Sequence, residues 1–138
     1  MSWLKLLREA WALAVEALCW VEQKGLSERV ALLRASRELD IQDPRAMGLA
    51  HKLFLETVRR QNFLDHLINS VSKENFLYNL DPGVRAFLRL YTYETKVRGH
   101  DSYEEATNIA RTGRSILGWR RIGDVEETLA MLLSLIHI

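Results

Sequence analysis

The sequence predicts an all-α protein, a single bundle of about seven helices. Apolar residues recur every three or four positions along most of the chain, as in Leu4, Leu7, Trp11 and Ala14, and this spacing aligns them on one face of a helix. No segment of strand length alternates apolar with polar residues. A length of 138 residues suits one domain with one core. We therefore expect residues 1–138 to form one helical domain.

Residues that can accept hydrogen bonds from free backbone amides mark the starts of the first four helices. Ser2 and Ser27 precede the first two, and the first ends at Gly25, a residue type that suits the turn after a helix. Asp43-Pro44 opens the third, because aspartate can cap a helix and proline fits its first position. Asn62 caps a short fourth. The second, third and fourth helices end near Leu39, Arg60 and Val71.

Similar signals predict the remaining helices. Residues 72–78 are ambiguous, and Asp81-Pro82 then repeats the cap and proline signal. That fifth helix runs to about residue 97 and is closed by Gly99. Ser102 and Glu105 have the spacing of a capping box, so a sixth helix begins there and fades near residue 113. The last helix begins at Asp124.

The sequence lacks the patterns of common catalytic and metal sites. Its four histidines are scattered, and it contains no His-x-x-x-His pair, Cys-x-x-Cys pair or glycine-rich phosphate loop. We expect no enzyme activity, cofactor or metal in this chain. The single cysteine, Cys19, predicts a buried, inert thiol in a reducing compartment. The apolar stretch Thr128–Ile138 is too short to span a bilayer, so we expect a cytoplasmic protein without membrane contact.

The charge is unevenly distributed along the chain. The net charge is only +1, but residues 84–98 and 107–123 are basic. On the fifth helix, Arg85, Arg89 and Lys96 fall on one polar ridge, and Arg45, Lys52 and Arg59, seven residues apart, share a stripe on the third. Guanidinium groups bind phosphate through paired hydrogen bonds. The second basic segment adds an aromatic residue that could stack on a base; its candidates are Arg114, Trp119, Arg120 and Arg121. The alternative is that these arginines are solvated helix faces and that Trp119 packs in the core.

Three segments resemble the NusB family. Leu80–Glu94 matches the pattern Leu-x-Pro-x-x-Arg-x-x-Leu-Arg-Leu-x-x-Tyr-Glu, Leu64–Ile68 is similar to the segment ending in Leu-Asp-x-x-Ile, and Glu105–Ala110 resembles Glu-Ala-Val-x-x-Ala. The resemblance implies an all-α, RNA-binding fold. Two departures stand out. Trp11–Ala14 replaces the family's Arg-x-x-Ala, leaving Arg8 as the nearest guanidinium. The last helix lacks the pattern Phe-Val-Asn-Gly-x-Leu.

The resemblance implies two functional settings. In one, the domain precedes a methyltransferase of the RsmB type, which makes 5-methylcytosine in ribosomal RNA with S-adenosylmethionine. In the other, a free antitermination factor binds single-stranded RNA together with the ribosomal protein NusE. The departures and the apolar ending Leu132–Ile138 favour the first, with a catalytic domain beyond residue 138 and S-adenosylmethionine bound only there. A third alternative is a helical interaction or oligomerisation module without RNA, using Leu129–Ile138 as its contact surface.

Overall fold

The computed structural model describes residues 3–135, apart from the side chains of Trp119 and Arg120. These residues form helices and contain no strand, which confirms the all-α prediction. By their contacts they divide into two compact units, Met1–Val58 and Arg59–Ile138, called unit 1 and unit 2 below. None of the described helices is long and apolar enough to cross a membrane.

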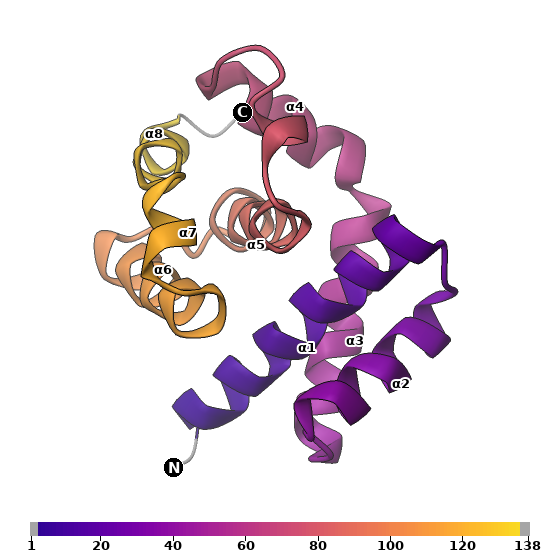
Figure 1. Cartoon of the computed structure of the whole chain (residues 1–138). Helices are drawn as coiled ribbons and strands as arrows, with labels where there is room; N and C mark the ends of the chain where they lie inside the picture. Colours follow the sequence, from indigo (N-terminus) through magenta and orange to yellow (C-terminus); the bar gives the residue numbers. More distant parts are fainter. Residues whose placement is uncertain (1–2, 136–138) are drawn as a thin grey trace. The chain divides into compact units, whose positions relative to one another are not determined.

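Unit 1 consists of three helices, α1 (Trp3–Lys24), α2 (Glu28–Leu39) and α3 (Pro44–Arg59, whose last residue is assigned to unit 2). The chain reverses after α1, so that α2 runs back beside it (Figure 1). The turn contains Gly25 with φ of 62°, a left-handed conformation that favours glycine. Ser27 then caps α2 by accepting a hydrogen bond from the amide of Val30 at 3.4 Å. These boundaries agree with the predicted ones.

Small residues lie between the helices of unit 1. Three alanines of α1 and two of α2 are fully buried, and alanine side chains let helix backbones approach closely; they are Ala10, Ala14, Ala17, Ala31 and Ala35. Larger side chains, including Trp11, Leu13, Leu53 and Phe54, complete the buried set. Trp11, which the apolar spacing places on one face of the first helix, thus packs in the core.

Unit 2 is built around α5 (Pro82–Thr92), which continues as a π-helical turn over Tyr93–Val97. Three helices contact α5: α4 (Gln61–Val71), α6 (Tyr103–Leu117) and α8 (Glu126–Ser134). Every residue from Gly83 to Lys96 is buried. Figure 1 shows α5 with α4 and α8 around it. The remaining elements are a 3-10 turn over Leu77–Asn79 and the short α7 (Trp119–Gly123).

Two helix starts in unit 2 differ from the prediction. Helix α4 begins at Gln61, and the residue at its N-cap position is Arg60, whose side chain makes no capping hydrogen bond. Asn62 therefore lies inside the helix and does not cap it. Helix α8 begins at Glu126 instead of Asp124, because α7 occupies the preceding residues. Helix α7 was not predicted, because a helix of five residues spans little more than one turn and has too few positions to show an apolar period.

Helix α6 is longer than predicted. It does not fade at Gly113 but continues to Leu117, and the chain turns at Gly118 with φ of 98°. Gly113 lies inside the helix against the ring of Phe87, where an added Cβ atom would come within 2.5 Å of Phe87 Cζ. This glycine therefore permits close packing of α6 on α5 and does not end the helix.

Candidate nucleic-acid interface

The three basic residues predicted to form a ridge on α5 are not on the surface. Arg85, Arg89 and Lys96 are 9%, 7% and 5% exposed. The prediction of a solvated ridge is therefore wrong. Apolar periodicity identifies only one buried face of a helix. Because α5 is surrounded by other helices, its polar face is buried as well.

Arg85 closes the loop that precedes its own helix. Its Nη1 atom donates hydrogen bonds to the carbonyl oxygens of Leu77, Tyr78 and Leu80, at 3.1, 3.2 and 2.9 Å. A loop must satisfy its backbone carbonyls when it is covered by other parts of the protein. The guanidinium group of Arg85 supplies these donors and holds the turn over Leu77–Asn79 against α5.

Arg89 forms a two-point ion pair with Asp65 of α4. Its Nε and Nη2 atoms donate to the two carboxylate oxygens at 2.8 and 3.0 Å. Little of either side chain is exposed, so each charge depends on the other for the contacts it would otherwise make with water. The pair holds α4 against α5 in one register.

Lys96 contacts the end of α8. Its Nζ atom donates to the carbonyl oxygens of Leu133 and Leu135, at 3.1 and 2.6 Å. The last carbonyls of a helix have no partner within it and carry partial negative charge, which explains why a buried ammonium group lies there. Tyr91 makes a related contact, donating from its hydroxyl to the carbonyl of Leu129 at 3.0 Å. Burial raises the pKa of Tyr91 to about 12.

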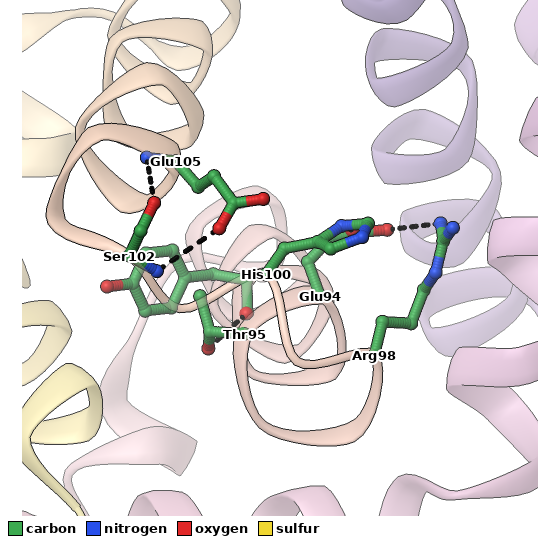
Figure 2. A network of polar contacts seen from close by, with 7 residues as sticks. Glu94, Thr95, Arg98, His100, Ser102 and Glu105 are labelled. Atoms are coloured by element: carbon green, nitrogen blue, oxygen red, sulfur yellow. Dashed lines mark hydrogen bonds and ion pairs between the residues drawn. The ribbon is translucent and has the colours of Figure 1, made fainter.

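A fourth charged residue of this segment, Glu94, is also buried and accepts from two neighbours (Figure 2). Its Oε1 atom accepts from Arg98 Nη1 at 2.9 Å, and its Oε2 atom lies 2.7 Å from His100 Nδ1. The amide of His100 also donates to the carbonyl of Glu94 at 3.0 Å. These contacts fix the turn that leads from α5 to α6.

The same view shows the start of α6 (Figure 2). Ser102 Oγ accepts from the amide of Glu105 at 3.1 Å, and Glu105 Oε1 accepts from the amide of Ser102 at 3.2 Å. This is the predicted capping box, and it is confirmed. The carboxylate of Glu105 is thus used to begin the helix.

In the second predicted segment, two arginines are paired with acids. Arg114 of α6 donates from Nε to Glu126 Oε1 at 3.1 Å, and Arg121 of α7 donates from Nε to Asp81 Oδ2 at 2.8 Å. Both contacts are exposed to solvent, where an ion pair contributes little and leaves its members able to change partners. The side chains of Trp119 and Arg120 lie outside the described residues, so their predicted roles stay predictions.

The contact between Arg121 and Asp81 takes the place of a capping hydrogen bond to the side chain of Asp81. It stands at the N-cap of α5, as predicted, but its side chain makes no capping hydrogen bond, and its carboxylate contacts Arg121 instead. A hollow of about 520 Å³ lies beside it, lined by Asn79, Leu80, Asp81, Pro82, Val84, Arg121 and Asp124. Its two aspartates outnumber its one arginine, so this hollow is not a favourable place for a phosphate group.

The two units present opposite charges to solvent. All eight basic residues of unit 1 are exposed, whereas four of its eight acidic residues are half-buried. In unit 2, eight of ten acidic residues are exposed, but only five of the ten basic residues with described side chains are. Exposed cations therefore outnumber exposed anions eight to four in unit 1, and exposed anions outnumber exposed cations eight to five in unit 2.

Residues 8–115 match the model of the NusB family. The chain belongs to the NusB family. No curated protein matches it, but two solved structures share its fold. One is a chain in the crystal structure of a plectonemic RNA supercoil, with a TM-score of 0.78, 20% identity and coverage of 94% of this chain and 95% of that one. The other, from antitermination factors NusB and NusE in complex with double-stranded RNA, has a TM-score of 0.76, 18% identity and coverage of 94% and 97%.

The position at which this chain departs from the NusB motif in α1 lies in the core. Trp11 is 2% exposed, so this chain has a packed aromatic residue where the family pattern has arginine. Arg8, one turn earlier, is exposed on α1. It remains a candidate for RNA contact, and it already has a contact within the protein.

Sequence inspection missed the exposed basic residues of unit 1 as a group. The heptad stripe of Arg45, Lys52 and Arg59 was visible, and the structure places all three on the surface. The surplus of exposed cations in unit 1 cannot be read from the sequence, because unit 1 contains equal numbers of acids and bases. Only the half-burial of its acids, among them Glu9, Glu16 and Glu56, makes the surface basic. Cys19, predicted to be buried, is half-buried. In the part of the chain that the structure describes, no three His, Cys, Asp or Glu residues are grouped so that they could hold a metal ion.

Proposed function

We propose that this protein is an RNA-binding domain of NusB type that acts by binding and not by catalysis. The observation that carries the proposal is the match of residues 8–115 to the NusB family. The surplus of exposed cations on unit 1 supports it, because a basic surface attracts the phosphate backbone and releases its counterions.

Binding of a fluorescent single-stranded RNA, followed by anisotropy at several salt concentrations, tests this function. The affinity should fall as salt rises, with a slope of about −0.7 in log affinity per log salt for each phosphate contacted. Absence of binding even at low salt, combined with a molecular mass that rises with concentration in light scattering, would favour an oligomerisation module instead.

We propose, as the more specific role, that the domain helps a 5-methylcytosine methyltransferase of the RsmB type to recognise ribosomal RNA. The support comes from the two departures of the sequence from the NusB pattern, of which Trp11 is the clearer. The cofactor S-adenosylmethionine would bind to the catalytic domain alone. Adding this chain in trans to such a catalytic domain should lower the KM for ribosomal RNA; an unchanged KM contradicts this role.

The second candidate role is that of an antitermination factor with a partner of NusE type. It is favoured by the likeness to the chain from the NusB and NusE complex, which spans 97% of that chain. A pull-down with a purified NusE-type protein, in the presence and absence of RNA, decides between the two settings. Stable capture supports antitermination, and no capture at micromolar concentration counts against it.

A further inference from the structure

We infer that single-stranded RNA is bound by the outer surface of α2 and α3 in unit 1, and not by the basic segments of unit 2. This inference rests on the proposed function and specifies its surface. Its first support is the distribution of exposed charge described above. The residues that make the sequence of unit 2 look basic, Arg85, Arg89 and Lys96, are used within the protein.

Helices α2 and α3 carry five of the eight exposed basic residues of unit 1; these are Arg29, Arg34, Arg37, Arg45 and Lys52. The two helices are joined at the surface, where His51 Nε2 lies 3.4 Å from Glu28 Oε1. Arg29 and Lys52 each follow one member of this pair in sequence, so both lie in the same part of unit 1. Arg45 is seven residues before Lys52, about 10 Å along the same face of α3.

The local contacts leave most of these cations available. Arg45 is paired with Asp43 through two hydrogen bonds, and a pair so exposed to solvent is readily exchanged for a phosphate contact. Arg34 is less available for a phosphate contact, because its guanidinium lies 4.4 Å from the centre of the Trp20 ring. We therefore assign the phosphate contacts to Arg29, Arg45 and Lys52.

The outer face of α2 adds an apolar site for a base. A hollow of about 510 Å³ is lined by Val30, Leu33, Arg34, Arg37 and Glu38. Val30 and Leu33 are 47% and 44% exposed, although both are apolar. Unpaired bases present flat apolar faces that can bury area against these aliphatic side chains, and an arginine beside them can stack on the base. A duplex hides these faces, which is why we assign single-stranded RNA to this surface.

The test compares two double variants with the same change in charge. Arg29→Gln with Lys52→Gln alters unit 1, and Lys73→Gln with Arg111→Gln alters exposed residues of unit 2. With a labelled 12-nucleotide single-stranded RNA, the unit 1 variant should lose about 1.4 from the slope of log affinity against log salt, and about 25-fold in affinity at 0.1 M salt. The unit 2 variant should keep the wild-type slope.

A third variant tests the hollow independently of charge. Val30→Ser with Leu33→Ser removes apolar contact area and should lower the affinity for RNA by about tenfold while leaving the salt slope unchanged, because no phosphate contact is removed. Both residues are exposed, so circular dichroism should show an unchanged fold.

The outcomes separate the two proposals. If the wild-type protein does not bind RNA at low salt, the proposed function fails. If it binds and the unit 1 variant keeps its slope, or both charge variants lose equally, the function stands and this surface is wrong. Loss of binding to polyglutamate, with RNA binding unchanged in the same variant, would assign the surface to an acidic protein segment and would also overturn the inference.

Discussion

The two units use their charged residues in opposite ways. In unit 1 the cations point to solvent and several acids are half-buried, whereas in unit 2 three cations and Glu94 are buried along α5 and the π-helical turn that continues it, and most acids face outward. The buried charges of α5 satisfy backbone carbonyls and a carboxylate, so they determine which loop and which helices pack there. The difference shows that a basic stretch of sequence predicts a basic surface only where its helix has a free face.

The largest effect should come from Arg89 in unit 2. Arg89→Met leaves Asp65 as an uncompensated, mostly buried charge, and we expect a loss of about 3–5 kcal/mol in the free energy of unfolding, measured by urea denaturation. Lys52→Met, the matched change on the surface of unit 1, should cost less than about 0.5 kcal/mol.

The Arg89 experiment has an internal control. Replacing both members of the pair, with Asp65→Leu and Arg89→Met, removes the unpaired charge and should recover most of the lost stability. Equal costs for Arg89→Met and Lys52→Met would contradict the contrast between the units. The variant also makes a poor probe of RNA binding, since its effect on folding would be mistaken for a lost contact.

Lys96→Met should have the next largest effect. The variant keeps the apolar stem but leaves the carbonyls of Leu133 and Leu135 without their donor, at a cost of about 1–3 kcal/mol. Lys73→Met, at an exposed position of the same unit, is the control and should be nearly neutral. Identical urea midpoints for the two variants would show that the Lys96 contact adds nothing to stability.

Gly113 of unit 2 and Gly48 of unit 1 both lie inside helices, and replacing each with alanine tests how closely other atoms pack against it. Gly113→Ala in α6 forces Phe87 to move and should destabilise the protein by about 1–3 kcal/mol. Gly48→Ala in α3 meets no atom within 4 Å and should stabilise it by up to about 1 kcal/mol. Thermal unfolding measures both changes. A Phe87→Leu change made together with Gly113→Ala should restore part of the loss, and no restoration would locate the strain elsewhere.

The smallest effect concerns an acid of unit 1. Burial raises the pKa of Glu16 above 4.5, and a hydrogen bond and charge repulsion from Glu38 add to the effect. Protonated Glu16 contributes stability that is fully present below pH 4.5, the pKa of this group in the unfolded chain. That stability is lost as the pH rises through the higher pKa of the group in the folded protein. Glu16→Gln should therefore be more stable than the wild type in urea denaturation at pH 7 and equally stable at pH 4. A gain that is constant across this range would exclude Glu16 as its source.

Most of the fold was predictable because helix boundaries depend on local chemistry. Ser27, Gly25, the Ser102 and Glu105 box and Pro82 act within one turn of the chain, and all mark ends that the structure shows. Gly113 was misjudged because its role depends on Phe87, a residue distant in sequence. Helix α7 was missed because five residues contain too little pattern.

The candidate site was less predictable, because it depends on what surrounds each helix. The ridge of Arg85, Arg89 and Lys96 has the correct helical spacing, yet its partners come from residues 65, 77–80 and 133–135. No local pattern identifies such contacts. Sequence could show that Arg45 and Lys52 share a face, but only the packed structure shows that this face is open.

The burial of α5 on all sides also determines how unit 2 opens. Amide protons exchange with solvent only when their hydrogen bonds break in the presence of water. For residues 83–96, water cannot enter until α4, α6 or α8 moves away, and that movement also breaks the contacts of Arg89 and Lys96. The amides of α5 should therefore exchange together and most slowly in unit 2, at a rate set by the unfolding of the whole unit.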